Sequence, residues 1–139
     1  MSLRTVPRLA DWEPRLNAFV AEVRERPHVY GEHDCLLFIG GAVEALTGED
    51  LWREHVGRYS DKAGARAYLR SLGHVSPGRY LDSLFRTIPA AFAQRGDVVI
   101  SHRIPGLYMA GTALFVGDGG LLEKPREMWT RTHAWAVGR

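Results

Sequence analysis

One predicted helix is apolar over most of its circumference, and it constrains the fold more than any other feature of the chain. It spans residues 35–47, with Asp34 as a good N-cap before it and Gly48 at the C-cap position after it. A helix without a wide polar face has to be buried, so the other elements must pack around it. Gly40 and Gly41 lie inside this helix and cost about 1 kcal/mol each relative to alanine. We therefore expect another element to approach the helix closely at these two positions.

Further helices are predicted on both sides of this central one. Apolar residues at helical spacing predict a helix over residues 12–26. Another is expected over residues 61–72, with Ser60 as its N-cap. A third is expected from Ser76 to about Thr87, because proline is tolerated in the first turn of a helix.

The last third of the chain has the pattern of short strands. Turn signals at residues 105–106 and 117–120 separate the apolar runs. Helices followed by an antiparallel sheet are typical of the α+β class. The 139 residues, without a linker or repeat, suit one domain that spans residues 1–139. The predicted strands are residues 98–102, 110–116, 121–123 and 133–137.

The composition excludes several kinds of site and partner. The chain has one cysteine, so neither an internal disulfide nor a four-cysteine zinc site can form. The net charge is +2 and the basic residues are scattered, which argues against a nucleic-acid partner. No apolar stretch is long enough to span a membrane, and the first residues lack the apolar core of a signal peptide. We therefore expect a protein made in the cytoplasm, with no membrane span, no metal and no cofactor.

Cys35 is the residue best placed for chemistry, because it follows the N-cap of the buried helix. Backbone N–H groups and the helix dipole favour negative charge at a helix N-terminus, and the thiolate is the nucleophilic form of cysteine. A catalytic cysteine is therefore expected in such a position. The alternative is an inert thiol, since free cysteine is commonly buried. We interpret Asp34 as a helix cap rather than as a catalytic acid.

Three short motifs occur along the chain in a characteristic order. They are YGEHDC at residues 30–35, RGDVVI at residues 95–100 and ALFVGDG at residues 113–119. Together they resemble the motifs of the NlpC-type cell-wall cysteine peptidases, and the resemblance covers most of residues 28–125. It implies a papain-like fold, with the cysteine at the start of a central helix that packs on a C-terminal antiparallel sheet. It also makes Tyr30, in the loop before Cys35, a candidate site residue.

A second set of features runs nearly from end to end of the chain. They are the helical start, YGEHDCLLF, ALTGED, GRYSDKAGARAYLRSLG, AQRGDVV and the final AWAV. In these features the chain is similar to a small family whose members are encoded beside tail genes in phages and prophages. This resemblance implies a virion component at a phage tail tip, with other tail-tip proteins as partners.

The catalytic pattern of the peptidases is incomplete in this chain. In that family the base is a histidine that opens the strand ending in Gly-Asp-Gly, and the resemblance puts Gly111 at that place. The orienting polar residue falls on Glu123, which could act as the third member of a triad. His102 is the first candidate for a substitute base. We place it at the end of a strand that pairs with the one opening near Gly111.

Two more histidines are candidates for the base. His133 opens the last predicted strand, whereas His33 lies two residues from Cys35 and is too close along the chain to align well. A metal site at His33 and Cys35 has little support, because the pair has no second cluster of ligands. The remaining histidines, His28, His55 and His74, are interpreted as ordinary loop or surface residues. Trp129 lies in a polar stretch and is interpreted as an exposed residue at a protein contact.

These observations give three hypotheses for function. The first is a phage or prophage tail-tip component with an NlpC-like fold and degenerate or absent catalysis. The second is an active cysteine endopeptidase or amidase that cleaves the stem peptides of peptidoglycan during genome delivery. There Cys35 attacks, His102 acts as base, Glu123 orients it and a backbone N–H stabilises the oxyanion. The third is an adaptor for tail assembly.

Overall fold

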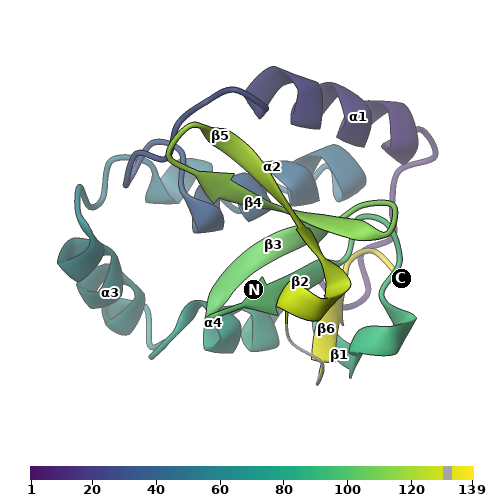
Figure 1. The fold of residues 1–139 in the computed structure, drawn as a ribbon. Helices are drawn as coiled ribbons and strands as arrows, with labels where there is room; N and C mark the ends of the chain where they lie inside the picture. Colours follow the sequence, from purple (N-terminus) through teal and green to yellow (C-terminus); the bar gives the residue numbers. More distant parts are fainter. Residues whose placement is uncertain (130–132) are drawn as a thin grey trace.

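Helices fill the first half of the chain and strands the second half (Figure 1). The computed structural model describes residues 1–129 and 133–139. The α-helices are α1 (Trp12–Val23), α2 (Cys35–Thr47), α3 (Lys62–Ser71) and α4 (Pro77–Leu84). Short 3-10 turns are η1 (Arg53–His55), η2 (Ala90–Phe92) and η3 (Arg126–Met128). The strands are β1 (Arg86–Pro89), β2 (Val98–Ser101), β3 (Ile104–Tyr108), β4 (Thr112–Gly117), β5 (Gly120–Pro125) and β6 (His133–Ala136).

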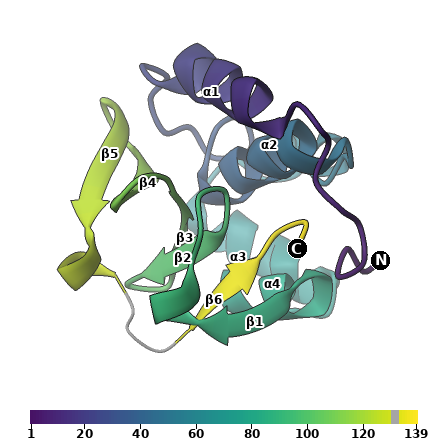
Figure 2. The same cartoon turned by 90° about the vertical axis from the view of Figure 1, so that its right-hand side faces the viewer.

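In the described residues the strands form one antiparallel sheet in the order β1-β6-β2-β3-β4-β5. The sheet is strongly twisted, with β5 and β1 at opposite edges (Figure 2). The last strand, β6, lies between β1 and β2 rather than at an edge. Neighbours from β2 to β5 are consecutive in the chain and are joined by short turns. The predicted α+β class, with helices first and an antiparallel sheet after them, is confirmed.

The predicted central helix forms as expected. The Asp34 carboxylate accepts a hydrogen bond from the Leu37 N–H at 3.0 Å, and Gly48 ends the helix in the left-handed conformation with φ of 82°. A Cβ on Gly40 would lie 2.6 Å from the Trp52 side chain, and one on Gly41 would lie 2.4 Å from the Phe19 ring. The close approach expected at both glycines is therefore confirmed.

The central helix packs on one face of the sheet. Its apolar residues share a core with α1, α4 and the helix-facing side chains of the strands, among them Val98, Leu107, Leu114 and Trp135. A smaller cluster covers the opposite face of the sheet, where Val99 and Phe115 contact residues of η2 and Trp129. The inner strands of the sheet are therefore buried on both faces, and α2 lies inside the larger core.

Two strands were not predicted, and the turn between β2 and β3 was misplaced. The turn is formed by His102 and Arg103, which both have positive φ, at 50° and 69°. The predicted turn signal at residues 105–106 lies inside β3 instead. A Cβ on Gly106 would lie 2.4 Å from the Phe115 ring, so this glycine makes room for a neighbour rather than for a turn.

Other boundaries also differ from the prediction. The helix expected up to Thr87 ends at Leu84, because residues 86–89 pair with β6 as strand β1. The helix expected over residues 12–26 ends at Val23. The N-cap of α3 is Asp61 rather than Ser60, and its carboxylate accepts from the Gly64 N–H. Strand pairing depends on tertiary partners, which local patterns do not reveal, and helix boundaries inferred from sequence are uncertain by one or two residues.

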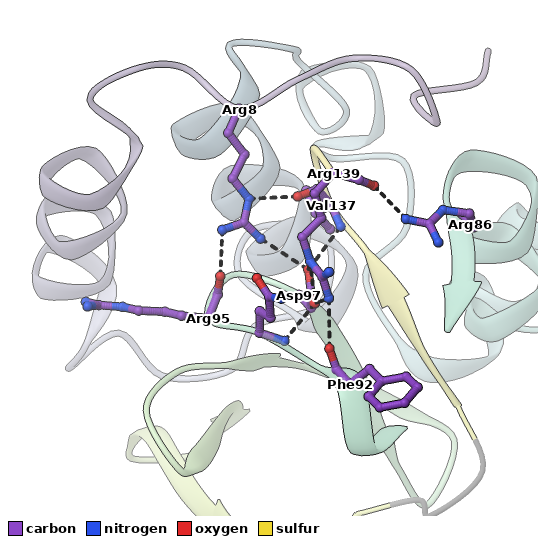
Figure 3. A network of polar contacts seen from close by, with 8 residues as sticks. Arg8, Arg86, Phe92, Arg95, Asp97, Val137 and Arg139 are labelled. Carbon is purple, nitrogen blue, oxygen red and sulfur yellow. Dashed lines mark hydrogen bonds and ion pairs between the residues drawn. The ribbon is translucent and has the colours of Figure 1, made fainter. Parts of the chain in front are cut away.

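The buried carboxylate of Asp97 links the N-terminal and C-terminal segments of the chain to the start of strand β2. Asp97 is fully buried, and Arg8 and Arg139 both point at it and pair with its carboxylate (Figure 3). Its oxygens also accept from the backbone N–H groups of Gln94 and Val137. The RGDVVI motif therefore has a folding role, because its aspartate pairs with both arginines at the point where β2 begins.

Replacing Asp97 with asparagine should destabilise the protein strongly. Two guanidinium groups would lose the carboxylate that neutralises them, and breaking a buried ion pair from one side costs about 3–5 kcal/mol. The free energy of unfolding in urea would measure the loss. Asp118→Asn is a matched control, because Asp118 is exposed in the β4–β5 turn. An equal effect of the two substitutions would contradict the role assigned to Asp97.

Among residues 1–129 and 133–139, no helix has the length and apolar character needed to cross a membrane.

Candidate functional site

The start of α2 is organised by a second buried carboxylate, that of Asp34. Its oxygens accept hydrogen bonds from the Gly31 N–H at 2.9 Å, the Leu37 N–H at 3.0 Å and the Tyr59 hydroxyl at 2.7 Å. The residue is only 2% exposed. All of these partners donate to the ionised carboxylate, so they hold Asp34 as an acceptor. The prediction of a helix cap is confirmed.

The loop before the cysteine is fixed by the segment that carries Tyr59. Gly31 has φ of +79°, and a Cβ there would lie 2.0 Å from the Tyr59 carbonyl oxygen. The Gly31 carbonyl in turn accepts a hydrogen bond from the Gly57 N–H at 2.9 Å. Only glycine fits this conformation and this contact. Gly31 and Asp34 of the YGEHDC motif therefore serve to seat α2.

The Cys35 thiol does not have the chemistry that its position at a helix N-terminus predicts. Burial, followed by the nearby Asp34 carboxylate, raises its pKa to about 12. The backbone N–H groups of Cys35 and Leu36 act in the opposite direction and do not outweigh these two effects. A thiol with this pKa is protonated at neutral pH, so in this structure burial and the carboxylate oppose the thiolate that the helix N-terminus favours.

The side chains gathered around Cys35 come from the loop and from the segment after η1. The hydroxyls of Tyr30 and Tyr59 both have raised pKa values, caused first by burial and also by the proximity of Cys35 and Asp34. Tyr30 also contacts His28 edge to face, with ring centroids 4.5 Å apart. The structure thus brings Tyr30 to Cys35, as the resemblance implies, and adds Tyr59, which the sequence did not single out.

Two of the histidines considered as bases, His33 and His102, lie in different surroundings. The groups that act on the Cys35 thiol are Asp34 and two backbone N–H groups, and neither His33 nor His102 is among them. His33 is buried and contacts the Phe38 ring edge to face, with centroids 6.2 Å apart. His102 is exposed in the β2–β3 turn.

The argument that placed His102 beside Gly111 is wrong. Strand β2 pairs with β3 and β6, and β3 separates it from β4. Gly111 lies in the β3–β4 turn, at the opposite end of these strands from His102.

Gly111 also lies far from the cysteine. Gly96 donates to the Tyr108 carbonyl at this end of the sheet, and a Cβ on Gly96 would lie 3.0 Å from Leu46 in the last turn of α2. Leu46 is eleven positions along the helix from Cys35, or roughly 16 Å along the axis at 1.5 Å per residue. The missing side chain at Gly111 therefore leaves no gap beside the thiol.

The other two candidate positions lie on the helix-facing side of the sheet. Glu123 is exposed on the edge strand β5, opposite Leu114 of the core. His133 starts β6 and contacts the Trp135 ring edge to face, with centroids 4.8 Å apart.

Two residues were assigned wrongly to the surface. His55 is 2% exposed, and its ring nitrogens lie 2.6 Å from the Tyr68 hydroxyl and 3.1 Å from the Tyr80 hydroxyl. It therefore joins η1 to α3 and α4. Trp129 is 3% exposed and packs against Tyr108. Both lie in polar stretches of sequence, so no local pattern indicates their burial.

A family model that is described as a domain of unknown function, DUF6950, matches residues 7–137. The chain belongs to the DUF6950 family. The match spans nearly the whole fold described above, from the segment of Arg8 to β6. Comparison of this DUF6950 domain with curated proteins and with solved structures found no match.

The Cys35 thiol should react slowly with an alkylating reagent. With a pKa of about 12, the thiolate fraction near pH 8 is far below that of a free cysteine, whose pKa is about 8.5. Carbamidomethylation by iodoacetamide should be roughly a hundredfold slower than for the same chain unfolded in urea. Mass spectrometry would follow the reaction. A folded protein that reacts as fast as the unfolded chain would contradict the protonated thiol.

The buried histidines should make the fold sensitive to acid. Burial lowers the pKa of His55 and of His33 below the ordinary value of 6.5. The unfolded chain then binds protons more readily, so stability is full above about pH 6.5 and falls as the pH drops below it. The free energy of unfolding in urea, measured from about pH 8 to about pH 5, would test this dependence, because that range spans the ordinary histidine pKa.

One substitution isolates the share of His55. His55→Gln should reduce the loss of stability in acid, leaving the part due to His33, whereas His102→Gln should keep the wild-type dependence because His102 is exposed. An unchanged acid dependence in His55→Gln would show that His55 titrates normally.

Proposed function

We propose that this DUF6950 domain is a structural component of a phage-type tail tip, with an NlpC-like fold and no peptidase activity. The tail context is supported by the end-to-end sequence resemblance to a family encoded beside tail genes. The fold assignment is supported by a buried helix that starts at a cysteine and packs on an antiparallel sheet formed by the second half of the chain.

The proposal that the protein lacks peptidase activity rests on the protonated state of the Cys35 thiol. A cysteine peptidase needs a thiolate, or a base that removes the proton as the sulfur attacks. Here an anionic carboxylate is the neighbouring charged group, and it raises the pKa of the thiol. That carboxylate accepts hydrogen bonds from the chain around it, so its role is to seat α2 and not to relay a proton.

One observation favours an active peptidase as the second candidate. The N–H groups of Cys35 and Leu36 both act on the thiol, and such backbone groups are what an oxyanion hole requires. A base would then have to reach the sulfur after substrate binds, as catalytic contacts can tighten only in the complex.

Digestion of purified peptidoglycan separates the two candidates. We expect the wild-type protein and Cys35→Ala to release the same background of soluble peptides, because the protonated thiol is not a nucleophile. Chromatography with mass spectrometry would detect the fragments. Release by the wild type alone would establish the peptidase and defeat the inactive scaffold. Circular dichroism of both proteins would verify that they are folded.

The tail role needs its own test. Particles induced from a host that encodes this chain would be purified and probed for it by mass spectrometry, and the Cys35→Ala chain would be compared in the same background. We expect both forms in the particle and equal infectivity. Absence of the protein from purified particles would contradict the tail-tip role.

A further inference from the structure

A pocket with a volume of about 330 Å³ lies between α1 and α2, under the segment of Trp52. This volume is at the lower end of the range for small-molecule sites. The pocket lies outside the surroundings of the thiol, because Cys35 is not among the residues that line it. Its wall comes from α1, the loop before α2, one side of α2 and the start of η1.

Two polar atoms of the pocket residues lack hydrogen-bond partners. They are the Nε2 atom of His33 and the Nε1 atom of Trp52. The whole His33 residue is only 3% exposed. Buried polar atoms without a partner are rare in folded proteins and cost free energy. Both atoms are shielded from water, and their residues line the pocket, so a partner would reach them from there.

The floor of the pocket is apolar. Phe19 and Phe38 stack with ring centroids 5.7 Å apart, and Val23 and Leu37 complete the surface. Gly41 is part of this floor, and a Cβ there would overlap the Phe19 ring. The floor suits a ring or a branched hydrocarbon group rather than a purely polar ligand.

The charges around the pocket disfavour an anionic ligand. Arg53 is paired with Glu44 and Asp50, so Glu44 is already neutralised. Glu22 and Glu32 remain against Arg26, and they would repel an anion that approached the buried donors. Burial and Arg26 lower the pKa of His33, so its imidazole is neutral and its Nε2 can accept a proton donor. The indole N–H of Trp52 is a donor only.

We propose that this pocket binds an uncharged amide attached to an apolar group. The amide oxygen accepts from the Trp52 indole N–H, and the amide N–H donates to His33 Nε2. The apolar group lies on Phe19 and Phe38. A group with one acceptor and one donor side by side satisfies both unpartnered atoms. An ammonium group has no acceptor for the indole N–H, and a carboxylate has no donor for His33 Nε2 and would be repelled by the glutamates.

Three small molecules with the same apolar body test this assignment. Phenylacetamide, phenylacetate and phenethylamine are uncharged, anionic and cationic at neutral pH. Each would be titrated at millimolar concentration into ¹⁵N-labelled protein, with the Trp52 indole N–H resonance as the reporter. We expect phenylacetamide to shift this resonance saturably and to bind more tightly than the other two. A resonance that no probe moves, or a charged probe that binds as tightly as the amide, would overturn the proposal.

Two tryptophan variants complete the test. Trp52→Phe keeps the aromatic ring and removes the N–H, and it should weaken phenylacetamide binding about fivefold, the effect of one neutral hydrogen bond. Trp129→Phe is the matched control, because its indole N–H is also buried without a partner but lies outside this pocket. Binding to Trp129→Phe should equal binding to the wild type. Unchanged affinity in Trp52→Phe would count against the proposed hydrogen bond.

Discussion

The burial of helix α2 is the constraint on which the rest of the structure depends. A helix that is apolar on most sides gains about 1.5–3 kcal/mol for each large side chain that it buries, but it has to be covered on every side. The sheet covers one side, α1 another, and Trp52 a third, where Gly40 removes the side chain that would block it. The segments that cover α2 come from both its N-terminal and its C-terminal side along the chain. Helix α1 precedes it, whereas Trp52 and the strands follow it.

The need to seat this helix also decides the chemistry at its first residue. The N-terminal N–H groups of a buried helix need acceptors, and Asp34 provides one while also holding Gly31 and Tyr59. A carboxylate suits this task because it accepts several hydrogen bonds at once. The same negative charge beside Cys35 opposes formation of a thiolate. Asp34 therefore stabilises the start of α2 and at the same time makes the thiol a weak nucleophile. This trade-off underlies the proposal of a scaffold without catalysis.

Two further polar groups in the interior differ in how they are satisfied. Asp97 has a full set of partners, including two guanidinium groups, and holds the N-terminal segment and the C-terminal residues against the start of β2 (Figure 3). His33 and Trp52 have polar atoms that lack partners within the chain. The fold satisfies Asp97 completely but leaves these two atoms without partners at one pocket. This contrast is the physical basis for assigning a ligand to the pocket. The start of α2 thus separates two environments, with the thiol on one side and the pocket on another.

The sequence by itself determined the elements whose signals are local. The caps of α2, its burial and the close packing at Gly40 and Gly41 follow from residue type and spacing, and so does the division into helices and strands. The sequence also located the candidate residues Tyr30, Asp34 and Cys35, because these are neighbours along the chain. Local patterns were less reliable for boundaries, as the cap of α3 shows.

Only the tertiary structure decided which distant residues meet. Strand β1 forms because β6 pairs with it, and β3 contains a proline and a glycine that read as a turn in isolation. Strand pairing then separated His102 from Gly111, and packing buried His55 and Trp129 inside polar stretches of sequence. For the same reason the pKa of Cys35 shifts upward, opposite to the direction expected at a helix N-terminus. The field of a helix N-terminus is a local property that sequence reveals, whereas desolvation and the direction of a neighbouring carboxylate depend on how the whole chain packs.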